Sequence, residues 1–193
     1  MKIRLIFIIF ALLSTRAYCQ SKNDLSLVFG TGSNGISAIG IGGPGFSGKG
    51  VTIYGLKYSR SLSKSFSIET GLEYSVNNVL WDYKDAYDPH FTPQKVSIRM
   101  VSVPVSLKLT FLKYLYTNVG LIADFETNQH SDSITPNQSG IGLGLGIGGK
   151  YDFDRMTVFV NPFFQLHTIV AFQNEGNGTL YDTGVKFGIG YRF

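Results

Sequence analysis

The chain of 193 residues has the length of one ordinary domain. Its 17 Lys and Arg residues exceed its 13 Asp and Glu residues, but Lys2, Arg4 and Arg16 all lie within the first 19 residues. The near-neutral remainder has no basic cluster, which argues against a nucleic-acid partner. With 23 glycines, 14% aromatic and only 16% charged residues, the composition excludes a coiled coil, a collagen and an acidic disordered chain, and it favours an all-β protein.

The N-terminus has the features of an export signal. After a short positive start, residues 5–13 are all apolar; this run is too short for a membrane-spanning helix of about 20 residues, but it fits the core of a signal peptide. Small residues, Ala17 and Cys19, precede the expected cleavage site, so we predict a signal peptide over residues 1–19 and a mature domain over residues 20–193. The alternative is a lipoprotein with lipid on Cys19, which the bulky residue before it disfavours.

Beyond the signal, apolar residues alternate with polar or small ones, which is the period of a β-strand. In the last such segment, Val185, Phe187 and Ile189 alternate with Lys186 and Gly188. The pattern predicts eight strands, at residues 25–30, 51–60, 66–76, 101–111, 117–125, 141–153, 158–170 and 185–193.

Short and long connections alternate between these strands. The short connections are residues 62–65, 112–114 and 154–156. The long connections are residues 31–50, 82–95, 127–139 and 173–180. Outer-membrane barrels have short periplasmic turns and longer extracellular loops, so we expect an eight-stranded antiparallel up-and-down transmembrane β-barrel. A 16-stranded porin would need about 160 residues for its strands alone, which excludes a wide pore. Apolar Met100 and Val101 break the alternation beside Pro104 and predict a β-bulge there.

The bulky side of the alternation is predicted to face lipid. Alternation alone would also fit a secreted lipocalin-like barrel. However, the lumen of an eight-stranded barrel is just wide enough for its own side chains or one small ligand, and Phe125, Phe153, Phe164 and Phe187 would overfill it. With the large side chains outward, only a lipid bilayer accommodates the barrel, which predicts the bacterial outer membrane as its location.

Three segments resemble known outer-membrane proteins. The last residues, with Gly188, Tyr191 and Phe193, resemble the C-terminal assembly signal of bacterial outer-membrane proteins. Residues 66–74, which contain Gly-Leu-Glu-Tyr, and residues 103–108, which begin with Val-Pro, resemble strands of the PorT-like barrel domain, a family of small barrels of the OmpA and OmpX type.

This resemblance covers about residues 24–193. It implies outer-membrane lipid as the surroundings and the barrel-assembly machinery as a partner during biogenesis. It implies no reaction. Because the best-known members of the family assist secretion or gliding machineries, the resemblance also implies an accessory role, with an envelope protein as a partner that contacts the loops; a fold alone does not establish such a role.

Ten ionisable side chains are predicted to point into the lumen. Because an unpaired ion is costly in a narrow lumen, five positive and five negative groups predict a network of ion pairs that fills the barrel. We call these ten residues the charge network; they are Lys57, Glu69, Glu73, Lys108, Asp124, Glu126, Lys150, Asp152, Lys186 and Arg192. The rest of the lumen is predicted to hold Tyr116, Phe159, Asn161, Phe163 and His167.

The sequence predicts no catalytic, metal or cofactor site. Glu69 and Glu73 could act as an acid and a base, but the many lysines favour ion pairing. His167 has no recognisable nucleophile motif beside it. Three G-x-G-x-x-G patterns, two expected in a loop and one in a strand, lack the helix that a phosphate site needs; they begin at Gly30, Gly40 and Gly144.

The sequence therefore predicts an integral outer-membrane barrel with a filled lumen, no stable porin-like conductance and no enzymatic activity. Its role would be structural, or one of binding through the long loops. The alternatives are a barrel enzyme that acts in the lumen or on lipid, and a secreted lipocalin-like barrel that binds a ligand.

Overall fold

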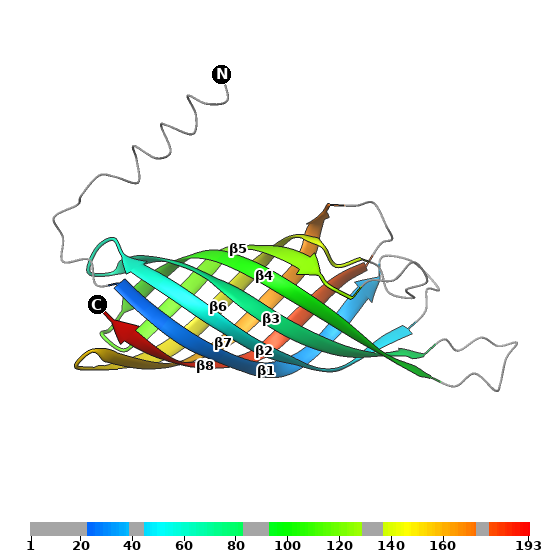
Figure 1. The fold of residues 1–193 in the computed structure, drawn as a ribbon, viewed down its shortest axis with the longest axis horizontal. Helices are drawn as coiled ribbons and strands as arrows, with labels where there is room; N and C mark the ends of the chain where they lie inside the picture. The colour runs from blue at the N-terminus through cyan, green and yellow to red at the C-terminus, as the bar shows by residue number, and fades with distance from the viewer. Residues whose placement is uncertain (1–22, 39–44, 83–92, 129–136, 173–177) are drawn as a thin grey trace, which may run out of the picture.

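The computed structural model describes residues 23–38, 45–82, 93–128, 137–172 and 178–193. They form eight strands, each antiparallel to the next, and β8 pairs with β1 to close a barrel (Figure 1). The strands are β1 (Asn23–Ala38), β2 (Gly45–Ser61), β3 (Phe66–Asp82), β4 (Gln94–Phe111), β5 (Leu115–Glu126), β6 (Gly140–Phe153), β7 (Met156–Ala171) and β8 (Gly178–Arg192). The predicted fold is confirmed. The predicted signal peptide, residues 1–19, lies outside the described residues.

The three short connections lie at one end of the barrel, together with the start of β1 and the end of β8 (left in Figure 1). They span residues 62–65, 112–114 and 154–155. Asn23 and Phe193 exchange two backbone hydrogen bonds of 2.9 Å there, which join the first strand to the last residue. We call this end the short-turn end, and the opposite one the long-loop end.

The strands extend further toward the long-loop end than the alternation predicted. β1 and β2 cover most of the predicted loop 31–50, and Gly32 and Gly35, which were expected in that loop, lie in β1 in regular register with β8. A Cβ atom on Gly32 would lie 2.1 Å from the carbonyl oxygen of Thr183. Glycine therefore permits two backbones to approach closely at this position, and it does not mark a turn.

The prediction of a β-bulge near Pro104 is wrong. The register of β4 with both of its neighbours is constant along the strand, and Met100 points into the barrel, where it is fully buried. Met100 packs in an apolar cluster inside the long-loop end. The side chains of β4 therefore keep alternating between inward and outward, but the inward ones become apolar at this end. Register shifts occur instead at Gly48–Gly50 in β2 and between β6 and β7 near residues 141–143.

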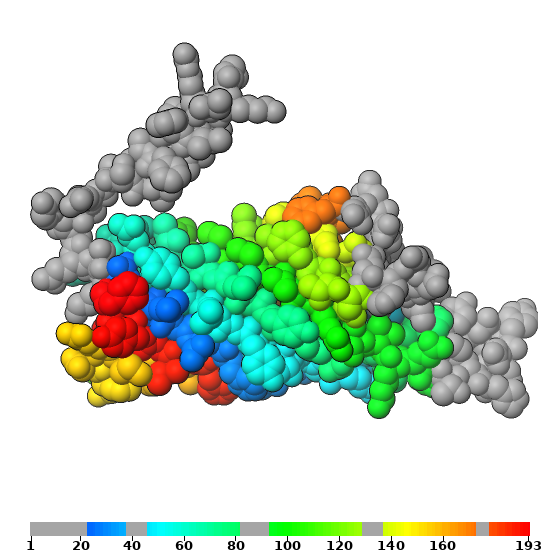
Figure 2. Space-filling model, in the orientation of Figure 1, coloured from blue at the N-terminus to red at the C-terminus, as the bar shows by residue number. Residues whose placement is uncertain are grey.

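The predicted outward direction of the bulky side chains is confirmed. Large apolar side chains are exposed on every strand, for example Leu27, Leu121 and Phe187, and Figure 2 shows one face of the barrel as a continuous wall of side chains. An apolar exterior of this extent, on a barrel with no free strand edge, is typical of a protein surrounded by lipid.

No helix among the described residues has the length and the apolar composition to cross a membrane.

Inward glycines make room for aromatic rings from neighbouring strands. A Cβ atom on Gly148 would lie 2.6 Å from the Tyr116 ring, and one on Gly188 would lie 2.2 Å from the Phe159 ring. Both rings are buried. Tyr116, Phe159 and Phe163 therefore occupy the lumen as predicted, on a wall whose glycines leave space for them.

Candidate functional site

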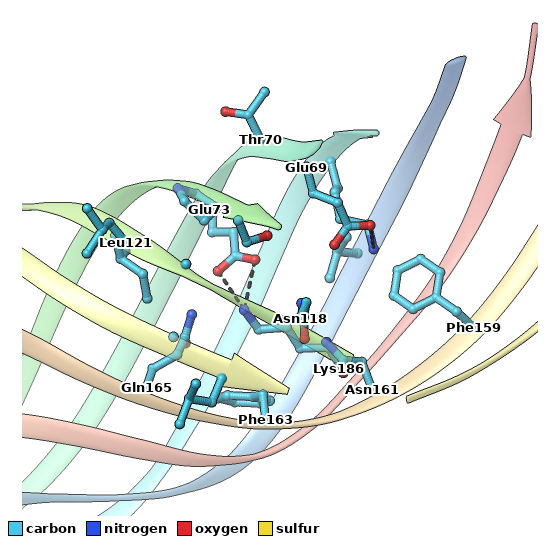
Figure 3. A pocket seen from close by; sticks show the side chains of 18 of the residues that line it. Glu69, Thr70, Glu73, Asn118, Leu121, Phe159, Asn161, Phe163, Gln165 and Lys186 are labelled. Atoms are coloured by element: carbon cyan, nitrogen blue, oxygen red, sulfur yellow. Dashed lines mark hydrogen bonds and ion pairs between the residues drawn. The ribbon is translucent and has the colours of Figure 1, made fainter. Parts of the chain in front are cut away.

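An ion pair spans the middle of the lumen. Lys186 on β8 donates to both carboxylate oxygens of Glu73 on β3, with Nζ–O distances of 2.8 and 2.7 Å. The Phe163 ring lies 4.8 Å from the same Nζ. Figure 3 shows this pair beside a cavity of about 60 Å³, which has room for a few water molecules and for no larger ligand.

Closer to the short-turn end, two lysines share one carboxylate. The Nζ atoms of Lys108 and Lys57 lie 2.8 and 3.3 Å from the same oxygen of Glu69, which is almost fully buried. Lys57 also lies over the Phe159 ring, 3.7 Å from its centroid, and Lys108 lies 4.9 Å from the Tyr116 ring centroid. One carboxylate balances only one of the two lysine charges, and cation–π contacts with the two aromatic rings stabilise the lysines further.

A second shared carboxylate lies at the short-turn end itself. Asp152 lies 3.3 Å from Lys150 Nζ and 3.5 Å from Arg192 Nη1, and it accepts a hydrogen bond of 2.8 Å from Thr157. Arg192 also donates to the carbonyl oxygen of Asp154. This group forms the rim of the lumen on the side of the short turns.

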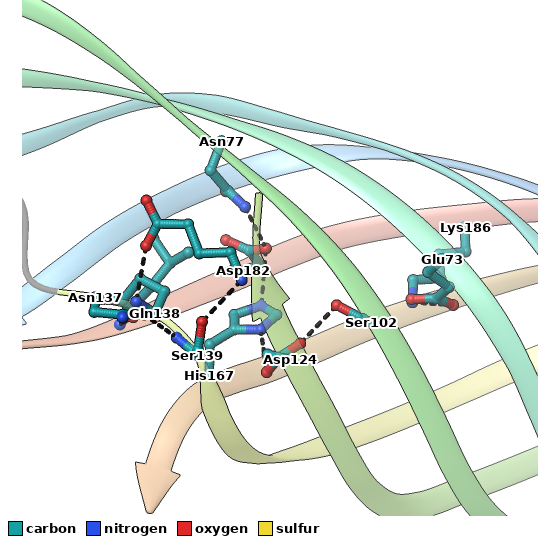
Figure 4. Close-up of polar contacts among 12 residues, drawn as sticks. Glu73, Asn77, Ser102, Asp124, Asn137, Gln138, Ser139, His167, Asp182 and Lys186 are labelled. Atoms are coloured by element: carbon teal, nitrogen blue, oxygen red, sulfur yellow. Dashed lines mark hydrogen bonds and ion pairs between the residues drawn. The ribbon is translucent and has the colours of Figure 1, made fainter. Parts of the chain in front are cut away.

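Toward the long-loop end, His167 lies between two buried carboxylates. Its Nδ1 is 2.9 Å from Asp124 and its Nε2 is 3.1 Å from Asp182, and neither carboxylate is accessible to solvent. Because ionised carboxylates only accept hydrogen bonds, both ring nitrogens donate, and the imidazole is a cation between two anions. We call these three residues the histidine triplet (Figure 4).

Neutral polar side chains add hydrogen bonds to the carboxylates of the histidine triplet. Ser102 donates to Asp124 at 2.6 Å, Asn77 donates to Asp182 at 3.4 Å, and Asn34 donates to Asn77 at 2.8 Å. The Ser102 hydroxyl is therefore directed at a carboxylate, and among the described residues no serine hydroxyl is hydrogen-bonded to His167. A serine–histidine–carboxylate arrangement for nucleophilic catalysis is not formed by these residues.

The backbone of β7 is irregular at the histidine triplet. Between Leu166 and Val170 the strand carries two more residues than the facing part of β6, and Thr168 has a φ of 53°, a left-handed conformation that a β-branched residue rarely adopts. His167 and Thr168 are consequently both buried, although they are adjacent in sequence. The bulge fixes the position at which the imidazole enters the lumen.

An apolar cluster lies in the lumen beyond the histidine triplet. It is formed by side chains from β1, β3, β4 and β8, nearly all of them buried, and Phe46 and Val96 pack against it. Its members are Ile36, Val79, Ile98, Met100 and Leu180. Beside this cluster lies the buried amide of Gln138, which accepts a hydrogen bond of 3.0 Å from the backbone of Leu180.

Nine of the ten residues of the predicted charge network take part in ion pairs inside the barrel. Asp124 pairs with His167, although the prediction had only Lys and Arg as its cations. Glu126 lies at the long-loop end of β5, where it accepts a hydrogen bond from the backbone of Gln138. Asp182, Asn77 and Asn34 were not identified from the sequence, because the predicted strands stopped short of these positions; extending the alternation of β8 backward from Lys186 would have placed Asp182 inside.

The predicted C-terminal assembly signal is divided between the two faces of β8. Gly188 lies inside against Phe159, whereas Tyr191 and Phe193 are 45% and 63% exposed on the outside. Within the described residues, no group of three or more His, Cys, Asp or Glu side chains could hold a metal ion. The pattern that begins at Gly40 lies partly outside the described residues, while the one that begins at Gly144 lies in β6 as expected.

No known family and no curated protein matches the sequence. Among solved structures, the chain is similar to the outer membrane protein OprG of Pseudomonas aeruginosa, with 15% identity and a TM-score of 0.59 over 90% of this chain and 96% of OprG. It is also similar to Ail, the attachment invasion locus protein of Yersinia pestis, with 12% identity and a TM-score of 0.49 over 91% of this chain and 100% of Ail. At these identities, the similarity to OprG concerns the fold alone.

The fold, the exterior and the lumen all indicate the same class of protein. The fold is that of small bacterial outer-membrane barrels, the exterior is apolar on every strand, and the charged groups pair inside. The chain is an integral outer-membrane β-barrel protein.

Proposed function

We propose that the protein is a closed, non-conducting barrel that anchors a binding surface at the long-loop end. The observation that carries this proposal is the filled lumen: the pair of Lys186 and Glu73 crosses its middle, and an apolar cluster fills its long-loop end. A solute that crosses the barrel would have to break buried ion pairs, which costs about 3–5 kcal/mol for each uncompensated charge.

The strands supply the surface for binding. A transmembrane strand needs about 9–11 residues, whereas β2 and β3 have 17 residues each and β4 has 18. Their ends at the long-loop side therefore extend beyond the lipid, where Lys49, Lys95 and Arg99 are exposed. The partner in this proposal is an envelope protein. The PorT-like resemblance favours an accessory role in a secretion or envelope machinery.

The proposal includes a signal peptide at residues 1–19, the barrel-assembly machinery as a partner during biogenesis, and the absence of enzymatic activity. The last point is supported by the hydrogen bonding of His167, whose two ring nitrogens are both engaged by carboxylates. A base in that state has no free nitrogen with which to accept a proton from a nucleophile. An enzyme acting in the lumen is the alternative, and substitution of His167 combined with an assay of lipid modification separates the two.

Conductance measurements test the closed barrel. We expect purified wild-type protein in planar bilayers to give no steady, large, voltage-independent channels. The double variant Glu69→Gln with Glu73→Gln leaves three lysines without their carboxylates, so brief leakage events should become more frequent and the folded state less stable. Lys113→Gln, an exposed substitution in a short turn, serves as the control. A stable, large-conductance pore in the wild type would contradict the proposal and make transport the leading function.

A further inference from the structure

The short-turn end of the barrel contains an open cavity of about 430 Å³ that is lined mainly by polar and charged residues. In outer-membrane barrels this end faces the periplasm. The cavity is lined by hydroxyl groups, including those of Ser59, Ser61 and Ser67, and by the Lys and Arg side chains described at the rim. We call this cavity the vestibule. The long-loop end of the same lumen holds an apolar cluster, so the two ends differ in polarity.

Cations outnumber carboxylates around the vestibule. Lys57 and Lys108 both pair with Glu69, and Lys150 and Arg192 both pair with Asp152. The remaining charged residues of the lining, Asp24 and Lys64, have opposite signs. Four cations are therefore held by two carboxylates, and a surplus of two positive charges remains.

This surplus lies in a place where water screens it poorly. The four side chains are only 13–21% exposed, and partly buried charges are screened much less than surface ones. Moreover, Arg192 Nε is buried and has no hydrogen-bond partner. An uncompensated cation in such surroundings attracts an anion, and unpaired guanidinium and ammonium donors are the groups that proteins use to bind oxyanions.

We propose that the vestibule is a binding site for a phosphate-type oxyanion, held between the pair Lys57 and Lys108 on one side and the pair Lys150 and Arg192 on the other. An anion with two negative charges would balance the surplus. Its tetrahedral oxygens would accept from the ammonium and guanidinium groups and from serine hydroxyls of the lining. The hydroxyl of Ser59, which makes no hydrogen bond within the described part of the chain, is one such donor.

Calorimetric titration of the folded, detergent-solubilised barrel tests this site. Inorganic phosphate at constant ionic strength is the first probe, and phosphatidic acid in mixed micelles is the second. Binding of inorganic phosphate supports a free anion as the ligand, and binding of phosphatidic acid alone supports a lipid headgroup. Absence of binding by both probes at millimolar concentration would overturn the proposal.

Matched variants distinguish this site from general attraction by positive charge. Lys150→Gln should weaken phosphate binding about tenfold, the size expected for one charge-assisted contact, whereas Asp152→Asn removes a competing carboxylate and should strengthen binding. Lys113→Gln, a change at the same end but outside the vestibule lining, should leave binding unchanged. Equal weakening by Lys113→Gln, or no effect of Lys150→Gln and Asp152→Asn in variants that fold normally, would contradict the assigned position.

Discussion

His167 shows how a single residue gains its role from partners that are distant in sequence. The alternation places its side chain inside, but nothing near it in sequence indicates the two carboxylates that it contacts. Asp124 is 43 positions away and Asp182 is 15 positions away. The β-bulge and the left-handed Thr168 beside it are tertiary features as well, because Thr carries no local signal for that conformation.

We expect His167→Asn to destabilise the folded barrel by about 3–5 kcal/mol, the cost of leaving a buried charge uncompensated. The substitution removes the cation and leaves Asp124 and Asp182 as two buried anions. Urea unfolding in lipid vesicles measures the change. Adding Asp182→Asn to this variant should restore part of the lost stability, because one anion is then removed. Wild-type stability of His167→Asn would contradict the assigned charges.

Leu121 tests which face of the barrel meets the lipid. Its side chain is 58% exposed on the outer face, so Leu121→Arg should lower the free energy of unfolding in lipid by about 2–4 kcal/mol if the residue lies near the bilayer midplane. Leu121→Phe, which keeps an apolar surface, should change it little. Unaltered stability of Leu121→Arg in a lipid bilayer would mean that this face does not meet hydrocarbon.

Two neighbouring inward glycines provide a comparison inside the barrel. A Cβ atom on Gly120 would lie 2.2 Å from the carbonyl oxygen of Val105, whereas one on Gly144 would first meet the flexible end of Ile122 at 3.2 Å. Gly120→Ala should therefore lower the urea midpoint clearly more than Gly144→Ala does. Equal effects would mean that the sheet relaxes at Gly120.

At the scale of the elements, strand number and connection order were predictable, but strand ends were not. The eight strands and the short turns could be predicted because alternation over lipid-facing residues is regular. Toward the long-loop end, the outward side chains become polar, as at Lys95 and Arg99, while the inward ones become apolar, as at Ile98 and Met100. In the sequence, this exchange of polarity looks like the end of a strand, because the apolar residues change sides. In the structure, the hydrogen-bonded pairing of β4 with β3 continues through these residues.

The last strand carries the prediction that concerns assembly. Phe193 closes the ladder with Asn23 and belongs to the predicted assembly signal, so Phe193→Ser should reduce the fraction of heat-modifiable, membrane-embedded protein. Phe153→Ser removes another exposed aromatic residue near the same end but leaves β8 intact, and it should have a smaller effect. Equal assembly of both variants would count against a special role of the terminal residue.

At the scale of the whole molecule, the lumen is ordered in layers along the barrel. An apolar cluster at the long-loop end is followed by the histidine triplet, then by a balanced ion pair, and finally by the vestibule with its surplus of cations. The sequence predicted the filling of the lumen and most of its charged residues. It did not predict the layers, because these depend on the register between strands, which period-two alternation does not define.

The contacts that cross the lumen have a consequence for how the barrel forms. Glu73 on β3 meets Lys186 on β8, and Asp124 on β5 meets His167 on β7; neither pair joins neighbouring strands. In an open, partly assembled sheet, these charges would have no partners and would retain their water, which opposes entry into hydrocarbon. Pairing of Glu73 with Lys186 requires β8 to be joined to β1, because that seam places β8 across the lumen from β3. A barrel in which this seam is open therefore leaves these two charges unpaired.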